Sequence, residues 1–369
     1  MLTRFDSQMM ARALRLAELG RYSTRPNPSV GCVLVRQQQI VAEGRTRPAG
    51  GDHAEVDALR QCSDSRGVHA YVTLEPCSHQ GRTGPCTQAL IEAGVAAVFV
   101  AMRDPNPAVS GAGIEQLRAA GISVTEMPLQ AVARPINAGF FQRMESGRPR
   151  VRLKLASSLD GRTAMASGES QWITGPAARA DVQRWRALSG AIVTGVGTVL
   201  QDDPALTVRD PDYDIPAQPL RVIVDSKLRT PPHSKILQQQ GETLIAHCST
   251  EPAADLVQQG AQLLKLPANS GRVDLPALIG ELARRQCNDI LVECGAELAG
   301  SLLAAQCVDE ILLYIAPALL GSAARPLALL PFTAMAQKLE LDIEDVRQLG
   351  ADLRLQLRPR YQATEATAS

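Results

Sequence analysis

The sequence has few aromatic residues, no excess of charge of either sign and no long apolar run. Aromatic side chains make up only 3% of the 369 residues, which leaves few stacking surfaces for single-stranded nucleic acid. Its 38 basic residues are balanced by 38 acidic ones, so no field of one sign attracts nucleic acid or an anionic membrane. We therefore expect neither partner.

Targeting segments and a disulfide framework are also lacking. No stretch approaches the roughly 20 apolar residues of a membrane-spanning helix, and the first residues carry charge without the apolar core of a secretory signal. The cysteines are scattered rather than clustered as in small secreted domains. They are Cys32, Cys62, Cys77, Cys86, Cys248, Cys287, Cys294 and Cys307. We expect a cytoplasmic protein with free thiols, and homo-oligomerisation remains open.

The length of the chain and a polar break within it indicate two domains. A chain of 369 residues with 45% hydrophobic residues can form two cores. The polar stretch at 145–149, which contains Gly147 and Pro149, is the natural break. We place one domain at 1–146 and the other at 150–361, and expect a frayed tail at 362–369.

The most informative motif lies between residues 53 and 86. It contains His53, Glu55, Cys77 and Cys86. One imidazole and two thiolates are the three protein ligands of a catalytic zinc, which keeps a fourth position for water. The order H-x-E and then P-C is that of zinc deaminases, in which the glutamate moves protons, although eight residues rather than two separate the cysteines here. A longer loop costs little extra closure entropy.

This motif has two other interpretations. Isolated cysteines in soluble proteins are usually small apolar core residues. A structural zinc would need a fourth ligand, for which His79 is available. We prefer a catalytic zinc, with His79 in the substrate pocket.

Helical and strand patterns alternate along the first domain, which predicts a mixed or parallel sheet with helices on both faces. The expected helices are 8–19, 53–62, 86–93, 113–120 and 129–144. The expected strands are 32–36, 40–45, 70–74, 95–101 and 122–125.

The second domain has the same alternating character. Its expected strands are 151–156, 191–194, 220–225, 243–247, 289–293 and 310–315, with a helix at about 177–188. Glycines follow two of these strands, at Gly195 and Gly295. Helices that begin there would present free N–H groups to a phosphate. Neither turn is a complete Rossmann fingerprint, so the residues alone indicate only an α/β domain that could bind a nucleotide.

Taken together, the motifs resemble a known family, the bifunctional riboflavin-biosynthesis enzymes that join diaminohydroxyphosphoribosylaminopyrimidine deaminase to 5-amino-6-(5-phosphoribosylamino)uracil reductase. The resemblance covers nearly the whole chain. It rests on PNPSVG (26–31), HAE (53–55), EPCSHQGRTGPC (75–86), KLASSLDGR (154–162), SGESQWI (167–173), GVGTVLQDDPALTVR (195–209) and VECG (292–295). The family shows the same cysteine spacing. Gly84 stands where it has proline, which affects only loop stiffness.

This resemblance implies a cytidine-deaminase-like three-layer α/β/α domain followed by a dihydrofolate-reductase-like α/β domain. The first would deaminate 2,5-diamino-6-(5-phospho-ribosylamino)pyrimidin-4(3H)-one with zinc held by His53, Cys77 and Cys86 and with Glu55 as proton shuttle. The second would use NADPH to reduce the ribosyl group of 5-amino-6-(5-phosphoribosylamino)uracil to a ribityl chain.

The resemblance also assigns residues in the second domain. NADPH contacts would come from Ala156, Trp172, Thr198, Asp202, Ser226, Gly295, Ala296, Glu297, Leu298, Ala299, Gly300 and Ser301. Substrate contacts would come from Ser170, Arg186, Leu206, Arg209 and Glu293. The two arginines suit a phosphate, which guanidinium binds with paired hydrogen bonds. Lys154 either lies near the ribose or is a strand residue facing solvent.

Two rival functions were considered. One is a nucleoside or nucleic-acid deaminase with an unrelated nucleotide-binding appendage, against which the balanced charge and scarce aromatics argue. The other is a non-catalytic zinc module whose second domain senses NADP. The presence of Glu55 argues against that rival, because a structural zinc needs no proton shuttle.

Overall fold

A computed structural model describes residues 2–80, 84–106 and 110–361. The chain divides into two compact units. Unit 1 comprises residues 1–148 with 214–216, and unit 2 comprises residues 149–213 with 217–369. Among the described residues, no helix is long and apolar enough to cross a membrane. The expected frayed tail at 362–369 lies outside the described residues.

Unit 1 is built on a five-stranded mixed sheet with the order β2-β1-β3-β4-β5. The strands are β1 (Gly31–Arg36), β2 (Gln39–Arg45), β3 (His69–Val72), β4 (Ala97–Val100) and β5 (Ser123–Glu126). β1 pairs antiparallel with both β2 and β3, whereas β3, β4 and β5 run parallel. The strongly buried β1 and β3 therefore lie inside the sheet, as continuous apolar runs predict.

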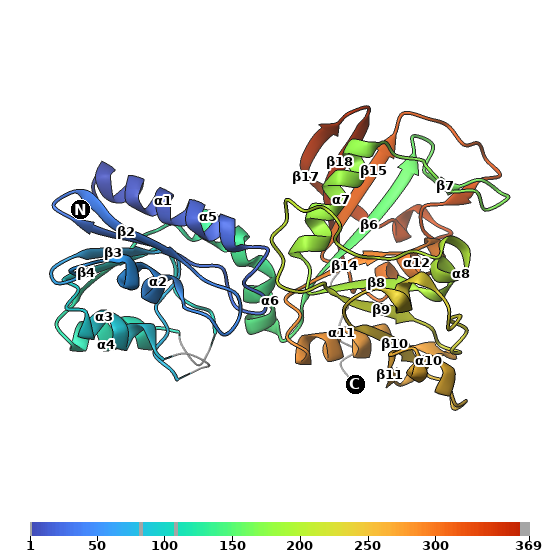
Figure 1. Ribbon diagram of the computed structural model, residues 1–369. Coiled ribbons are helices and arrows are strands. Elements are labelled where there is room, and N and C mark those ends of the chain that lie inside the picture. The colour runs from blue at the N-terminus through green and yellow to red at the C-terminus, as the bar shows by residue number, and fades with distance from the viewer. Residues whose placement is uncertain (1, 81–83, 107–109, 362–369) are drawn as a thin grey trace, which may run out of the picture. The chain divides into compact units, whose positions relative to one another are not determined.

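Helices cover both faces of this sheet, with α1 on one side and α2, α3 and α4 on the other (Figure 1). They are α1 (Arg4–Gly20), α2 (Ala54–Gln61), α3 (Cys86–Glu92), α4 (Ala112–Ala119), α5 (Gln130–Ala133) and α6 (Ala138–Ser146), with a 3₁₀ turn η1 (Arg134–Asn137). Gly31 of β1 allows α1 to approach closely, because a Cβ there would lie 2.0 Å from the Ala13 carbonyl oxygen.

Two helix predictions in unit 1 were wrong in detail. α1 begins at Arg4 rather than at residue 8, because Thr3 and Asp6 form a capping box one turn earlier than the expected Ser7 cap. The helix expected at 129–144 is interrupted by η1, which contains Pro135. Proline lacks the N–H of a helical hydrogen bond and clashes with the preceding turn.

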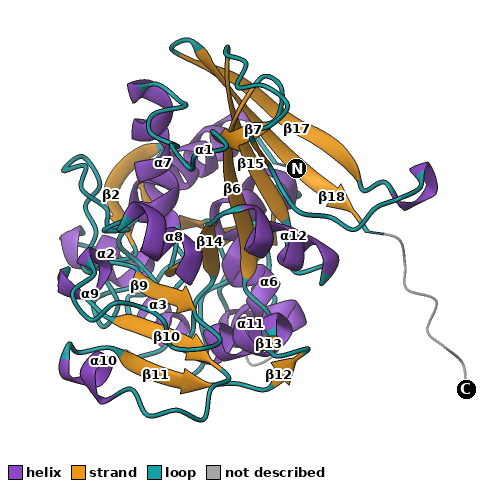
Figure 2. Ribbon diagram, turned by 90° about the vertical axis from the view of Figure 1, so that its right-hand side faces the viewer, coloured by secondary structure: helices purple, strands orange, loops and turns teal. Residues whose placement is uncertain are grey.

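Unit 2 contains a nine-stranded sheet with the order β11-β10-β9-β8-β14-β6-β15-β18-β17. Its strands are β6 (Arg150–Ser158), β8 (Ala191–Gly195), β9 (Leu220–Val224), β10 (Thr243–His247), β11 (Gln262–Lys265), β14 (Asp289–Glu293), β15 (Glu310–Ala316), β17 (Glu340–Leu349) and β18 (Asp352–Arg360). All pairs from β11 to β15 are parallel, whereas β18 and β17 add an antiparallel hairpin. Figure 2 shows β9, β10 and β11 beside one another at one end of the sheet. The strands of this hairpin are not among those expected from the sequence.

Alternate residues of the central strands contribute side chains to two hydrophobic cores on opposite faces of this sheet. Ala191 and Val193 belong to the larger core, whereas Ile192 between them belongs to the smaller one. The helices are α7 (Pro176–Leu188), α8 (Val196–Asp202), α9 (Lys235–Gln238), α10 (Ala254–Gln258), α11 (Leu275–Arg284) and α12 (Ala296–Ala304). α11 and α12 pack on the larger core, and α8, α9 and α10 on the smaller.

Short elements complete unit 2. They are the ladder of β7 (Arg162–Ala164) with β16 (Arg325–Pro326), the ladder of β12 (Ala268–Asn269) with β13 (Arg272–Val273), and the 3₁₀ turn η2 (Met335–Gln337). The mixed sheet of unit 1 and the largely parallel sheet of unit 2, both with helices, confirm the predicted α/β class.

Candidate functional sites of the two units

Three residues of unit 1 that are distant in sequence form one cluster. His53 is the N-cap of α2, Cys77 lies in the loop after β3, and Cys86 begins α3. The His53 Nδ1 atom is 3.5 Å from Cys77 Sγ and 3.3 Å from Cys86 Sγ. Tetrahedral zinc with ordinary bond lengths holds nitrogen and sulfur ligands about 3.6 Å apart. The donor set and its spacing therefore fit zinc.

His79, the alternative fourth ligand, is not part of this cluster. Within the described residues, only His53, Cys77 and Cys86 bring three such ligand atoms together, all within 4.8 Å of one another. His79 is exposed on the loop between the cysteines. The arrangement is thus the three-ligand set typical of a catalytic rather than a closed structural site.

The electrostatics of the cluster favour one thiolate. Hydrogen bonds from Cys86 and His53 lower the pKa of Cys77 to about 4, and the Cys86 backbone N–H donates to the Cys77 sulfur at 3.4 Å. The interaction with Cys77, together with burial, raises the pKa of Cys86. Two buried like charges repel, so the thiolate form is favoured at Cys77 rather than at both sulfurs.

Glu55 lies beside the cluster on the first turn of α2 and is 3% exposed. Burial, followed by the nearby Cys77, raises the pKa of Glu55 to about 7. A carboxyl group with a pKa near neutrality can both accept and return a proton at physiological pH. The geometry therefore suits Glu55 as a proton carrier.

In unit 2 the predicted site residues gather at the carboxyl ends of parallel strands. β9, β8, β14 and β6 are adjacent and parallel, so their carboxyl ends lie along one edge, where open α/β sheets bind ligands. Ala156 lies on β6, Thr198 and Asp202 on α8 after β8, Ser226 after β9, and Glu293 at the end of β14.

Glu293 is the centre of this edge. Its carboxylate accepts from Arg186 Nε at 2.6 Å and Nη2 at 3.0 Å, and both side chains are largely buried. Lys154 lies opposite Glu293 in the β6–β14 register. Burial alone would raise the pKa of Glu293, but Arg186, with smaller contributions from Lys154 and Arg209, lowers it. Burial lowers the pKa of Lys154.

The Arg186 guanidinium is thus engaged by the protein itself, since Nη1 also donates to the Thr207 carbonyl oxygen at 3.0 Å. Arg209, by contrast, is exposed and lies within electrostatic range of Glu293. Arg186 and Arg209, which the sequence assigned to the same role, therefore differ: Arg186 is held by the protein, and Arg209 is exposed. Lys154 is half-buried beside Glu293 rather than on an open strand surface.

Of the remaining predicted ligand contacts, one is hydrogen-bonded to another predicted site residue. Ser170 donates to Asp202 at 3.2 Å, which joins a predicted substrate contact to a predicted cofactor contact. Trp172 is 69% exposed, and the Arg179 guanidinium carbon lies 4.5 Å from the centroid of its ring. The Leu206 side chain is buried in the smaller core and its φ is 48°, so only its main chain can reach a ligand. The Ser226 hydroxyl accepts from the Val273 N–H at 3.0 Å.

The turn after β14 fits an anionic cofactor. Gly295 is the N-cap of α12 and provides no capping side chain, which leaves the first N–H groups of the helix for a phosphate. Gly300 allows the chain at Leu329 to cross the helix, because a Cβ at Gly300 would lie 1.9 Å from the Leu329 carbonyl oxygen. The Leu329 N–H also donates to the Ala296 carbonyl at 3.0 Å.

Comparison with known proteins decides the family. The profile of the RibD C-terminal domain matches residues 149–355, and that of the cytidine and deoxycytidylate deaminase zinc-binding region matches residues 3–102. The chain is 49% identical over 364 residues to the riboflavin biosynthesis protein RibD of Escherichia coli, covering 95% of this chain and 99% of the relative. The chain belongs to the RibD family.

Relatives and solved structures agree with this membership. RibD of Haemophilus influenzae is 46% identical, with 96% of this chain and 98% of the relative covered. A structure of Acinetobacter baumannii RibD has a TM-score of 0.91 at 45% identity and covers 97% of this chain and 99% of its own. The deaminase/reductase of Thermotoga maritima has a TM-score of 0.86 at 30% identity, with 96% and 99% covered.

Membership of the RibD family confirms the expected class of enzyme. The chain is a bifunctional enzyme of riboflavin biosynthesis, with a cytidine-deaminase-like zinc domain followed by a reductase domain, and its cofactors are zinc and NADPH. This excludes the rival in which the second domain is an unrelated appendage.

Loss of the buried ion pair gives a first test of the unit 2 site. We expect Arg186→Met to destabilise unit 2 by about 3–5 kcal/mol, because Glu293 would remain buried without its main partner. Arg347→Met removes an exposed pair with Asp345 on β17 and should cost less than about 1 kcal/mol. Chemical denaturation of both variants measures the difference, and equal effects would show that the Arg186 pair contributes no more than a surface contact.

Proposed function

We propose that His53, Cys77 and Cys86 hold the zinc of the deaminase, which we assign to residues 1–146. Its substrate would be 2,5-diamino-6-(5-phospho-ribosylamino)pyrimidin-4(3H)-one. The observation that carries this assignment is the three-ligand cluster beside the buried Glu55. When bound, zinc supplies an acidified water as nucleophile. Glu55 accepts the proton of that water and delivers a proton to the amino group that leaves as ammonia. His79, exposed on the loop between the two cysteines, would contact the substrate from there.

For the reductase, assigned to residues 150–361, we propose that Lys154, Glu293 and Arg209 bind the phosphoribosylaminouracil. NADPH supplies the hydride, which would reach C1′ of the ribosyl group. A closed sugar ring offers no electrophilic double bond, so a ring-opened imine is the acceptor. In its protonated form that imine is positively charged, and the Glu293 carboxylate, oriented by Arg186, complements this charge. Lys154 can hydrogen-bond the ribose hydroxyls.

The cofactor would lie along the carboxyl edge of β9, β8, β14 and β6. The N-terminus of α12, from Gly295 to Ser301, fits its diphosphate. Ala156, Thr198, Asp202 and Ser226 lie along this edge, and Ser170 and Trp172 belong to the loop that Asp202 contacts. Leu206 would contribute its main chain.

Variants of the zinc cluster test the deaminase assignment. Cys77→Ser should lose zinc and ammonia release, while reduction of pre-deaminated substrate continues. Glu55→Gln should retain zinc and lose deamination by at least about 10²-fold, the scale of a general acid/base. Zinc analysis and ammonia release on the same samples distinguish ligand from proton carrier. Full zinc in Cys77→Ser, or zinc loss in Glu55→Gln, would contradict the respective role.

Arg209 tests the substrate phosphate. Because Arg186 is engaged by Glu293 and Thr207, the exposed Arg209 is the arginine available for the phosphate. A charge-assisted hydrogen bond contributes roughly 1.5–3 kcal/mol, so Arg209→Ala should lower reductase kcat/KM about 10- to 150-fold. NADPH binding and ammonia release should not change. An unaltered kcat/KM would remove Arg209 from the site, and equal loss of both activities would indicate misfolding.

We also propose that the chain self-associates through one face of the β17–β18 hairpin. Ile343 and Val346, which are 64% and 54% exposed, pair with Leu357 and Leu355. Leu357 is a core residue and Leu355 packs against that core, so the apolar face continues from the core on to the edge strand. A second copy with the same face would cover it.

The Ile343→Lys variant measures this association. The lysine should shift the protein to monomer in sedimentation experiments, because the charge could not be buried in a self-paired apolar face. Glu340→Lys on the same strand is the exposed polar control. A wild-type protein that is already monomeric, or an Ile343→Lys variant of unchanged size, would reject the proposal.

A further inference from the structure

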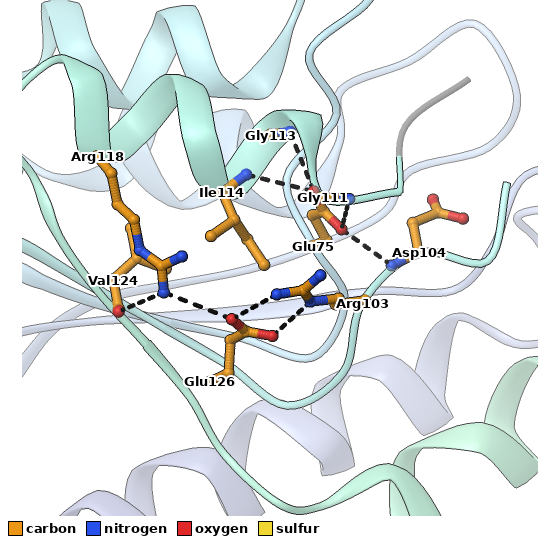
Figure 3. Close-up of polar contacts among 9 residues, drawn as sticks. All are labelled: Glu75, Arg103, Asp104, Gly111, Gly113, Ile114, Arg118, Val124 and Glu126. Carbon is orange, nitrogen blue, oxygen red and sulfur yellow. Dashed lines mark hydrogen bonds and ion pairs between the residues drawn. The ribbon is translucent and has the colours of Figure 1, made fainter. Parts of the chain in front are cut away.

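Glu75 is a buried carboxylate that no step of the proposed chemistry uses. It is 3% exposed and stands two residues before Cys77. Among the described residues, its hydrogen-bond donors are all backbone N–H groups rather than cationic side chains. Oε2 accepts from Asp104 at 3.3 Å and from Gly111 at 3.0 Å, and Oε1 accepts from Gly113 at 3.0 Å and from Ile114 at 3.3 Å. Figure 3 shows these four contacts converging on one side chain.

These contacts make Glu75 the cap of α4. Gly111, the N-cap, has no side chain and a φ of 82°. Gly113 and Ile114 occupy the second and third positions of the helix, whose N–H groups a capping side chain ordinarily accepts. Glu75 supplies that acceptor from 38 and 39 residues away, and its negative charge also suits the positive end of the helix.

Helix α4 packs closely against the segment that carries Cys77. A Cβ at Gly113 would lie 2.1 Å from the Pro76 carbonyl oxygen, so the first turn of α4 contacts the peptide between Glu75 and the proposed ligand. Substitution at Gly113 would require this segment or the helix to move.

A second link joins α4 to the other cysteine. Thr87, immediately after Cys86, is fully buried, and its hydroxyl lies 2.6 Å from Gln116 Oε1 of α4, its nearer acceptor, and 3.3 Å from the Cys77 carbonyl oxygen. Its backbone N–H donates to the Cys77 carbonyl oxygen at 3.1 Å. α4 therefore holds the segment before one sulfur through Glu75 and the segment after the other through Thr87.

We infer that α4 acts as a splint that sets the separation of the two thiolate ligands, with Glu75 and Thr87 as positioning residues. This rests on the proposed function, in which Cys77 and Cys86 hold zinc. Groups that orient metal ligands without touching the metal commonly change metal affinity 10- to 100-fold when they are removed. The splint predicts that loss of either link weakens zinc retention even though every ligand is still present.

The test measures zinc release from the zinc-loaded full chain to an excess of a chromogenic chelator. Glu75→Gln puts an amide N–H₂ against backbone N–H donors, and Thr87→Val removes the hydroxyl at nearly constant volume. Both should release zinc about 10- to 100-fold faster than wild type. Thr87→Ser, which keeps the hydroxyl, should restore slow release.

Glu126 provides a matched control. It is a carboxylate on neighbouring β5 that accepts from Arg103 and Arg118 at the surface (Figure 3). Because exposed pairs contribute little, Glu126→Gln should release zinc like wild type. Reduction of pre-deaminated substrate should be unchanged in all variants, which reports that unit 2 is folded.

The possible outcomes distinguish failure of the positioning role of α4 from failure of the zinc-ligand assignment. Wild-type release rates in both Glu75→Gln and Thr87→Val would overturn the splint, as would a lower unfolding temperature of the metal-free forms without faster release. If Glu75→Gln does not fold, Thr87→Val with its serine rescue decides. Failure of the wild type to bind zinc, or undiminished zinc in Cys77→Ser, would instead reject the ligand assignment.

Discussion

Each site depends on a buried carboxylate placed after a central strand. In unit 1, Glu75 follows β3 and accepts four backbone N–H groups, so the segment that carries Cys77 is held to α4. In unit 2, Glu293 ends β14 and is held by Arg186 from α7. Burying such a group is costly unless its acceptor sites are filled. The cost is offset in unit 1 by peptide dipoles and in unit 2 by a guanidinium.

This difference suits the two sites. Both carboxylate oxygens of Glu75 accept hydrogen bonds, whereas Glu55, the proton carrier that we propose, has its pKa raised to about 7 by burial and the nearby Cys77. The pKa of Glu293 is lowered because Arg186, together with Lys154 and Arg209, outweighs burial, and Lys154 is its neighbour across the strand pair. A carboxyl group that moves protons needs a pKa near neutrality, whereas one that complements a cation must stay ionised.

How much could be read from the sequence depended on the distance between cooperating residues. The zinc motif was readable because its residue types lie within 34 positions and have a characteristic order. The Arg186–Glu293 pair spans 107 positions, and no local pattern marks one arginine as a partner and Arg209 as exposed. Glu75 reads as part of a ligand motif, and its contacts with α4 follow only from the fold. The break at Pro135 and the alternating polar and apolar residues of β18, by contrast, were local signals that could have been used.

The crossing of Leu329 over α12 has a consequence for the energetics of cofactor use. Since the bare Gly300 and the Leu329–Ala296 hydrogen bond hold the helix in place, the turn from Gly295 is already shaped before any ligand arrives. The entropy of ordering that turn is then lost once, during folding, and is not lost again in every catalytic cycle. A dinucleotide bound where we propose would then exchange between turnovers on a turn that the fold has already ordered.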